Sequence, residues 1–218
     1  MAPFFKGYLK MNNLEVSNHP ILQHKLTQLR DKSTRPSEFR RLMREISYHM
    51  AYECTKDLKS ALKSIETPLE KTQGKMIDEN LVVVSIFRAG NAMVDGLLEV
   101  LDFARVGHIG IYRDKFINNT VEYYFKLPKN VQGSTIVLAD PMVATGDTVI
   151  AAIDRLKQYD VGPIKFVCLL MSPQAYERIS EAHPDVKIFA VSMERELSAD
   201  KYLLPGMGDA GDRLYGTV

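Results

Sequence analysis

The stretch from Ser134 to Asp160 constrains the fold most, because a strand, a loop and a helix follow one another in it without a break. Its first part, Thr135–Leu138, is a β-branched and apolar run, which predicts a strand buried in a parallel sheet. Its last part places apolar residues at helical spacing, ending with Leu156 and Tyr159. The stretch therefore predicts one strand–helix unit of an α/β fold.

The loop of this unit is made of small and hydroxyl-bearing residues and leads directly into the helix: Ala144, Thr145, Gly146, Asp147 and Thr148. Main-chain amides at a helix N-terminus, together with the positive end of the helix dipole, bind anions. Asp140 ends the strand and is expected to face the same crevice, where a carboxylate suits a sugar hydroxyl or a hydrated cation. The unit is therefore predicted to hold a sugar phosphate.

Two other phosphate-binding loops do not fit this sequence. A Walker-type loop needs a lysine after its last glycine, whereas Gly146 is followed by Asp147. A G-x-G-x-x-G pattern occurs at 206–211, but only seven residues follow it, too few for the helix and strand that dinucleotide binding requires. The glycines near the C-terminus therefore need another explanation.

Composition restricts the class of protein and its partners. A length of 218 residues suits one domain, predicted to span 1–218. The formal net charge of +1 gives no bulk attraction to nucleic acid or to an anionic membrane. Cys54 and Cys168 stand far apart in apolar stretches, which predicts buried, reduced thiols. Since no apolar run approaches the roughly 20 residues that span a bilayer, we expect a cytoplasmic protein with no membrane or nucleic-acid partner.

The rest of the chain alternates between helical and strand patterns. Helices are predicted at 20–31, 37–65, 91–101 and 173–182, with a connection at 66–80. Ser37 and Ser172 are the expected N-caps of two of these helices. Strands are predicted at Leu81–Phe87, Arg105–Tyr112, Lys165–Met171 and Val186–Met193, and a hairpin-like excursion at 114–126. This order predicts an open, mainly parallel α/β sheet flanked by helices, with its site along the strand ends.

Arginines follow two of these strands. Arg88 follows the strand that ends at Phe87, and Arg113 follows the one that ends at Tyr112. Both are expected to face the crevice at the carboxyl ends of the strands, where a guanidinium group can bind phosphate oxygens in a bidentate way. Further basic residues are interpreted as a solvated helical face or a subunit contact, with an RNA-binding patch as the alternative: Arg30, Lys32, Arg35, Arg40, Arg41 and Arg44.

The motif at the strand end resembles the phosphate-binding motif of type I phosphoribosyltransferases. Its form D-P-M-x-A-T-G, starting at Asp140, is similar to the variant found in uracil phosphoribosyltransferases. The sequence YLLPGMGDAGDR at Tyr202–Arg213 resembles the C-terminal signature of the same family. Shorter matches lie at Ile86–Gly90, at Tyr112-Arg113 and at 18–20, so that the resemblance covers nearly the whole chain.

The resemblance implies transfer of the phosphoribosyl group of 5-phosphoribosyl 1-pyrophosphate (PRPP) to N1 of uracil, giving UMP and pyrophosphate. It assigns the 5′-phosphate to residues 144–148, the ribose hydroxyls to Asp140, and the pyrophosphate to Arg88 and Arg113. It further implies that Mg²⁺ is bound through PRPP rather than by protein ligands. The PRPP-binding residues implied in this way are Arg88, Arg113, Asp140, Pro141, Met142, Val143, Ala144, Thr145, Gly146, Asp147, Thr148 and Asp209.

The resemblance also implies that a hood near the C-terminus reads uracil through main-chain groups. The implied uracil-binding residues are Leu203, Gly208, Asp209 and Ala210, with Asp209 between base and PRPP, and Asp209 and Arg113 as catalytic residues. Exposed peptide groups can match the acceptor–donor–acceptor edge of uracil where no Cβ intervenes. Relatives form dimers or tetramers and some respond to GTP, so a homo-oligomer and a GTP effector are also implied, together with a mobile loop within 114–126 that covers the site.

Two alternatives and one departure stay open at this level. The same fold could serve a pyrimidine-responsive RNA-binding regulator, or a phosphoribosyltransferase for another base such as orotate or a purine. The departure is Asp147, which stands where relatives often have a second glycine. A carboxylate that points toward a bound phosphate is repulsive, so we expect the Asp147 side chain to point to solvent.

Overall fold

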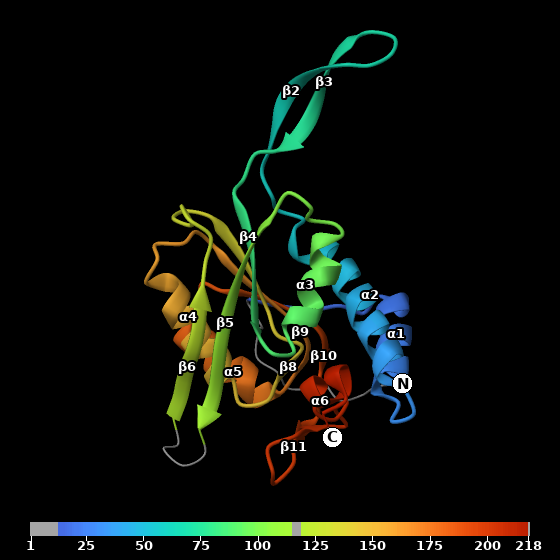
Figure 1. The fold of residues 1–218 in the computed structure, drawn as a ribbon, viewed down its shortest axis with the longest axis vertical. Helices are drawn as coiled ribbons and strands as arrows, with labels where there is room; N and C mark the ends of the chain where they lie inside the picture. The colour runs from blue at the N-terminus through green and yellow to red at the C-terminus, as the bar shows by residue number, and fades with distance from the viewer. Residues whose placement is uncertain (1–12, 115–118, 218) are drawn as a thin grey trace.

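The computed structural model of the protein describes residues 13–114 and 119–217, without the side chains of Arg113, Asp114 and Asn119. Its centre is an eight-stranded sheet in the order β1-β10-β9-β7-β4-β5-β6, with β8 paired to β9 (Figure 1). Within this sheet, every described strand pair is parallel except β5 with β6. The strands are β1 (Leu14–Val16), β4 (Leu81–Phe87), β5 (Arg105–Asp114), β6 (Asn119–Lys126), β7 (Thr135–Ala139), β8 (Met142–Val143), β9 (Ile164–Met171) and β10 (Lys187–Met193).

Helices cover both faces of the sheet, which separates two hydrophobic cores. Side chains that alternate along each strand point into one core and then the other. In β4, Val83 belongs to one core, whereas Val82 and Val84 belong to the other. This alternation explains why the central strands are continuous apolar runs. The first face is covered by α1 (Pro20–Arg30), α2 (Pro36–Cys54) and α3 (Asn91–Leu98), and the second by α4 (Asp147–Lys157) and α5 (Pro173–Ala182). The predicted fold class is confirmed.

Three helices begin with proline at the first position. Proline is suited to it because its missing N–H group would have no partner within the helix there. Ser172 caps α5 as predicted, since its side chain accepts a hydrogen bond from the Ala175 amide. His19 caps α1 by accepting from the Ile21 amide through Nδ1. The prediction of Ser37 as a cap is wrong, because α2 starts one residue earlier and its N-cap is Arg35, without a side-chain bond.

The prediction of one helix over 37–65 is also wrong. Helix α2 ends at Cys54, and residues 60–66 form β2 (Ser60–Glu66), which pairs antiparallel with β3 (Lys71–Ile77). The predicted connection at 66–80 is thus mostly strand. Leu62 and Ile65 are spaced like one face of a helix, but pairing with a strand further along the chain overrides this local preference. The β2–β3 hairpin extends away from the body of the protein (Figure 1).

Two smaller features lie at the other end of the molecule, where the parallel strands have their carboxyl ends (Figure 1). Strands β5 and β6 continue beyond the sheet as the predicted hairpin-like excursion, although residues 115–118, on which the predicted mobile loop depends, lie outside the described residues. The C-terminal segment forms the hood from β11 (Glu196–Leu197), β12 (Leu203–Leu204) and α6 (Ala210–Tyr215). The hood and the excursion therefore flank the strand ends.

Both cysteines are buried and free, as the sequence predicts. Burial raises the pKa of the Cys54 thiol to about 12 and raises the pKa of Cys168 as well. No described helix has the length and apolar character needed to cross a bilayer.

Candidate active site

Three predicted segments meet at the carboxyl ends of the strands: the turn after β4, the loop between β7 and α4, and the hood. Gly90 lies so close to the end of β7 that a Cβ there would clash with the Ala139 carbonyl oxygen. On the other side of the turn, Arg88 lies next to Gly211 of α6 and 3.5 Å from the Asp212 carboxylate. The turn thus links the end of β7, which leads into the phosphate loop, to the hood.

The phosphate loop, residues 144–148, has the predicted backbone form. Gly146 adopts a left-handed conformation with φ of 83°, which favours glycine, and helix α4 begins at the next residue. Met142 and Val143 pair with the end of β9, and the Pro141 carbonyl accepts from the amides of Leu169 and Leu170. The loop is therefore held by the sheet on one side and by the helix on the other.

The Asp147 side chain does not point to free solvent, and that prediction is wrong. Its carboxylate lies 2.5 Å from the Arg178 guanidinium of α5 and accepts from the Thr145 hydroxyl at 2.9 Å. Only 21% of the side chain is exposed. The negative charge that the sequence places in this loop is therefore paired with a positive side chain, Arg178, of the neighbouring helix α5.

Asp140 stands at the end of β7, between the turn after β4 and the phosphate loop. Asp140 is half-buried, and partial desolvation of its carboxyl group raises its pKa to about 7, while a hydrogen bond from the Met142 amide opposes the rise only in part. A carboxylate with this pKa exchanges protons near neutral pH, and hydroxyl groups of a ligand could stabilise its charged form.

The two predicted strand-end arginines differ in what the structure describes. The Arg88 side chain is exposed at the crevice, and its only ion pair within the described residues, with Asp212, is long at 3.5 Å. A bound phosphate could therefore engage it without breaking a strong contact. Arg113 lies on β5, next to the excursion, but its side chain is outside the description, and its catalytic role stays a prediction.

The hood presents main-chain groups at the predicted uracil-binding residues. Leu203 and Ala210 have buried side chains, whereas Gly208 is exposed and adopts φ of 77°. Gly206 also has a positive φ, and a Cβ there would clash with the Leu203 carbonyl oxygen. Asp209 caps α6 by accepting from the Asp212 amide at 2.9 Å. The 206–211 glycines thus form a tight turn and a helix start, and no dinucleotide-binding unit.

A buried ion pair that sequence reasoning missed anchors the hood. Glu194 is 3% exposed and accepts two hydrogen bonds from Arg30 of α1, at 2.5 and 2.7 Å. The same carboxylate accepts from the Gly206 amide at 2.7 Å, and Arg30 donates to the Gly206 carbonyl at 2.8 Å. Both main-chain groups of Gly206 are therefore fixed by one pair, whose members are 164 residues apart.

The basic residues around α1 and α2 are only in part the solvated face that the sequence suggested. Besides Arg30, Arg40 donates to the Leu214 carbonyl at 2.6 Å, so it also supports the C-terminal segment. Arg213 donates from the hood to the carbonyl groups of Leu29 and Met207, each at 2.8 Å. Arg41 and Arg44 pair with exposed acids on the surface. The C-terminal segment is thus attached to α1 and α2 by arginines.

Within 13–114 and 119–217, no group of three or more His, Cys, Asp or Glu side chains is arranged to hold a metal ion. Asp140 and Asp209 are the acids at the crevice and its hood, and their oxygens can accept hydrogen bonds from the water ligands that Mg²⁺ tends to keep. The donor set therefore fits a hydrated magnesium ion that arrives with a phosphate ligand.

The raised pKa of Asp140 predicts a pH-dependent effect on stability. Because the folded protein binds this proton more tightly than the unfolded chain, the group favours folding below about pH 4, and this contribution is lost as the pH rises to about 7. Asp140→Asn, which stays neutral, should therefore gain free energy of unfolding relative to the wild-type protein between these pH values. Urea unfolding of both proteins at pH 5 and pH 8 measures the gain.

A carboxyl-to-amide change at an exposed acid, Asp200→Asn, is the control and should show no such trend. A stability difference between Asp140→Asn and wild type that stays constant or shrinks with rising pH would contradict the burial of this carboxyl group.

Comparison with known proteins supports the family that the motifs suggest. A family model described as "UPRTase: Uracil phosphoribosyltransferase" matches residues 16–217. The uracil phosphoribosyltransferase of Polaromonas naphthalenivorans is 52% identical over 208 residues, which cover 95% of this chain and 100% of the relative. That of Legionella pneumophila is 47% identical over 210 residues, covering 96% and 98%.

Solved structures share the fold. The AQ2163 protein from Aquifex aeolicus superposes with a TM-score of 0.89 at 31% identity and covers 94% of this chain and 98% of its own. Adenine phosphoribosyltransferase from Leishmania donovani, at 12% identity, has a TM-score of 0.57 over 86% of both chains and supports the fold alone. By sequence over almost its full length, and by a sheet whose phosphate loop and hood meet at the strand ends, this chain belongs to the uracil phosphoribosyltransferase family.

Proposed function

We propose that the protein transfers the phosphoribosyl group of PRPP to N1 of uracil, releasing UMP and pyrophosphate. The observation that carries this proposal is that the turn holding Arg88 packs against the end of β7, which leads into the phosphate loop, and also lies beside α6 of the hood. One ligand on the loop and a second under the hood would meet at the strand ends. Nucleophilic attack by the base on the ribose C1 needs this juxtaposition rather than a covalent intermediate on the protein.

Each proposed site residue has a role that its position allows. The amides of 144–148 bind the 5′-phosphate at the N-terminus of α4. Asp140 accepts hydrogen bonds from the ribose hydroxyls, and Arg88 and Arg113 bind the pyrophosphate and stabilise its charge as it leaves. Leu203, Gly208 and Ala210 read the uracil edge through main-chain groups, with Asp209 between the two ligands.

Magnesium and GTP are further parts of the proposal. Mg²⁺ would enter bound to PRPP oxygens, with Asp140 and Asp209 as outer partners through water, and would supply charge stabilisation for the leaving pyrophosphate. GTP is proposed as an effector, and the cytoplasm as the location, where two buried free thiols suit a reducing compartment.

The two alternatives are less well supported. An RNA-binding regulator would use the basic residues of α1 and α2, but Arg30 and Arg40 are bound to the C-terminal segment, and Arg41 and Arg44 pair with acids. A transferase specific for orotate or a purine would need a different hood, whereas Tyr202–Arg213 carries the uracil signature.

The proposal predicts strict selection of uracil over cytosine. Cytosine presents an amino donor where uracil presents an acceptor, so that a main-chain amide of the hood would lose its partner. This mismatch costs about 1–3 kcal/mol or more, which lowers kcat/KM at least about fivefold. A PRPP-dependent assay with uracil, cytosine, orotate and hypoxanthine, with and without Mg²⁺ and GTP, measures the selection.

Comparable turnover of cytosine and uracil would contradict main-chain reading by the hood. Turnover of orotate or hypoxanthine in place of uracil would favour the transferase for another base. Tight RNA binding that weakens steeply with salt, without turnover of any base, would favour the regulator.

The buried ion pair under the hood gives a second prediction. Glu194→Gln replaces one acceptor oxygen by an amide NH₂ donor. In the wild-type protein both oxygens accept from Arg30, and one also accepts from Gly206. We expect a loss of about 2–4 kcal/mol of stability, since one member of a largely buried pair is left uncompensated. In the folded fraction the KM for uracil should rise several-fold more than the KM for PRPP, because Gly206 orients the uracil-reading turn.

The control is Glu196→Gln, the same substitution in the same hood at an exposed pair with Arg195. It should change stability by less than about 0.5 kcal/mol. Equal effects of Glu194→Gln on the KM values of uracil and PRPP would show that the pair supports the fold without positioning the hood.

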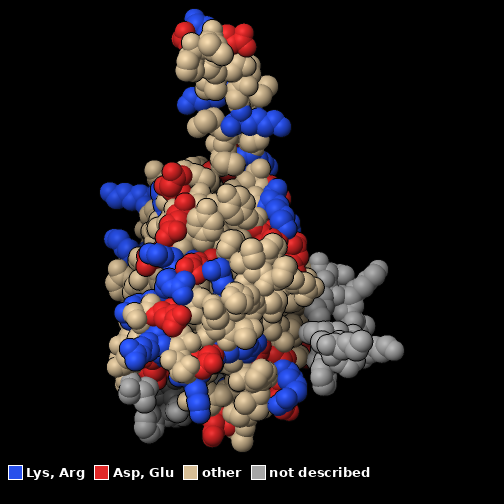
Figure 2. All heavy atoms as spheres, turned by 90° about the vertical axis from the view of Figure 1, so that its right-hand side faces the viewer, with Lys and Arg blue, Asp and Glu red and all other residues tan. Residues whose placement is uncertain are grey.

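The β2–β3 hairpin supports a homo-oligomer as the proposed assembly. It projects from the end opposite the hood, and Figure 2 shows it as a narrow extension whose surface carries charges of both signs. A two-stranded hairpin alone is marginally stable in water. It nevertheless exposes five large apolar side chains, namely Leu62, Ile65, Leu69, Met76 and Ile77.

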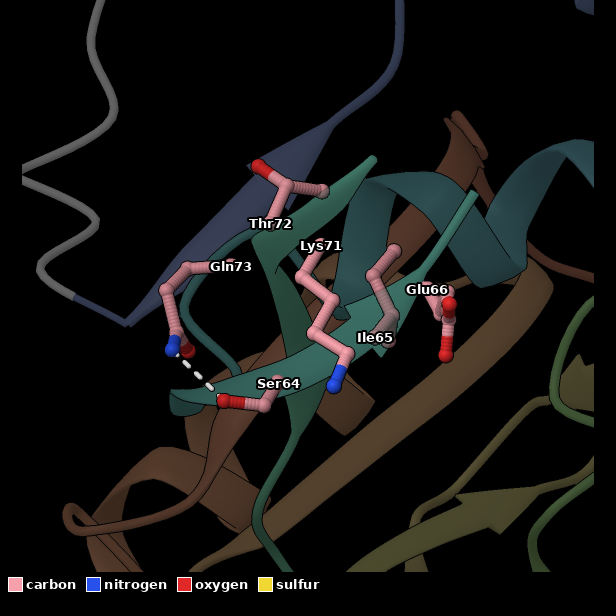
Figure 3. Close-up of a pocket in the computed structure, with 6 residues that line it drawn as sticks. All are labelled: Ser64, Ile65, Glu66, Lys71, Thr72 and Gln73. Atoms are coloured by element: carbon pink, nitrogen blue, oxygen red, sulfur yellow. Dashed lines mark hydrogen bonds between the residues drawn. The ribbon is translucent and has the colours of Figure 1, made fainter. Parts of the chain in front are cut away.

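A second copy of this chain is the occupant that fits the hairpin. The shallow hollow on the hairpin is lined by acidic, basic and neutral polar side chains beside Ile65, and a Gln73–Ser64 hydrogen bond of 2.7 Å crosses the strands (Figure 3). Mixed charges allow the same surface to face itself around a two-fold axis, each arm covering the other copy. The arms would then bury the apolar side chains reciprocally.

Substitution of the arm should dissociate the oligomer. The variant Leu62→Ser/Leu69→Ser/Met76→Ser removes apolar area that only a partner would bury, so sedimentation velocity should shift toward the monomer mass of 24.7 kDa. Phe103→Ser, at an exposed apolar residue that is not part of the arm, is the control. An unchanged mass for the triple variant would contradict an arm-mediated assembly.

A further inference from the structure

Helix α5 binds the phosphate loop from the side opposite the crevice. The Ser172 amide donates to the Val143 carbonyl at 3.0 Å, and the Ser172 hydroxyl donates to the Ala144 carbonyl at 2.6 Å. Arg178, in the second turn of the helix, donates to the Thr145 carbonyl at 2.7 Å. Three consecutive carbonyl groups, one just before the loop and two within it, thus accept hydrogen bonds from one helix and its cap.

These contacts fix the direction of the loop amides. In a planar trans peptide the N–H group points away from the C=O group of the same unit. Carbonyl groups that are drawn toward α5 therefore turn the amides of Ala144, Thr145 and Gly146 away from the helix, toward the crevice. A side chain at Gly146 would contact Ile179 and Ala175 of α5, which shows how closely the helix supports the loop.

Arg178 makes a second contact that concerns charge. Its guanidinium group also pairs with Asp147 at 2.5 Å, while the other carboxylate oxygen accepts from the Thr145 hydroxyl. One fork therefore joins the Thr145 carbonyl and the Asp147 carboxylate. Without the guanidinium, the carboxylate at the first residue of α4 would lose this counter-ion, and less of its repulsion of a phosphate bound at the same helix end would be offset.

We infer that Arg178 is a positioning residue for PRPP, which acts through the loop by holding the Thr145 carbonyl and neutralising Asp147. The inference rests on the proposed placement of the 5′-phosphate on this loop. As an ordinary surface ion pair, with 42% of the Arg178 side chain exposed, the contact would add little stability and would leave ligand binding unchanged. Kinetics separates these two roles.

The test measures KM for PRPP, KM for uracil, kcat and Tm of Arg178→Ala in two backgrounds, with Asp147 and with Asp147→Asn. With Asp147 present, we expect KM for PRPP to rise about tenfold, while KM for uracil and kcat stay within about twofold of wild type. In the Asp147→Asn background the same change should raise KM for PRPP no more than about threefold, because no charge is left uncompensated. Arg178→Lys keeps the charge without the fork and should give an intermediate KM.

The matched control is Lys157→Ala, which breaks an exposed 2.8 Å pair between Lys157 at the end of α4 and Asp185. A KM for PRPP within about twofold of wild type in Arg178→Ala would overturn the inference. Equal effects of Arg178→Ala in both backgrounds would overturn the charge part, and wild-type kinetics of Arg178→Lys would overturn the part assigned to the Thr145 carbonyl.

Gly146→Ala separates this inference from the proposed site. It strains the loop at its left-handed residue and should raise KM for PRPP if the loop binds the phosphate. If Gly146→Ala and Arg178→Ala both leave KM for PRPP unchanged, the placement of the 5′-phosphate is wrong. If only Arg178→Ala leaves it unchanged, the role of Arg178 alone is wrong.

Discussion

The proposed site depends on main-chain groups whose direction is fixed by contacts on the side away from the ligand. A peptide group binds a ligand well only if it does not have to reorient, and both halves of this site meet that condition through contacts on the side away from the crevice. Helix α5 holds the carbonyl groups of the phosphate loop, and the Arg30–Glu194 pair holds both main-chain groups of Gly206. The ligand-facing residues can then be small, as glycine and alanine are here.

This arrangement explains why the two halves of the site lie far apart in the chain yet share one construction. Each uses the end of a core strand, β7 for the loop and β10 for Glu194, and each connects it to a charged side chain on a helix. Parallel strands bring their carboxyl ends to one edge of the sheet, so that the two supported loops face each other. The Arg88 turn packs against the end of β7 and lies beside α6, so it contacts both parts of the site.

Sequence patterns predicted the parts of the fold that local rules determine. The strand, loop and helix of Ser134–Asp160 could be predicted because burial on both faces, a glycine turn and helical spacing all lie in one stretch. Residues 60–77 were mistaken because Ala61, Leu62 and Ile65 look helical locally, while the pairing that makes them strand is not local. Glu194 was missed because its partner is 164 residues away, and a glutamate after a strand gives no signal of burial.

Asp147 shows how side-chain charge can vary in a site that is proposed to bind its ligand through main-chain groups. A binding mode that uses amides places few demands on the side chains of the loop, except that their charge must not oppose the ligand. A glycine meets this demand by having no side chain, and Asp147 meets it through Arg178, which is itself a support of the loop. Because one guanidinium group serves both purposes, the carboxylate and its counter-ion form a unit. An acid in a phosphate loop is therefore best interpreted together with the cation that the fold places behind it.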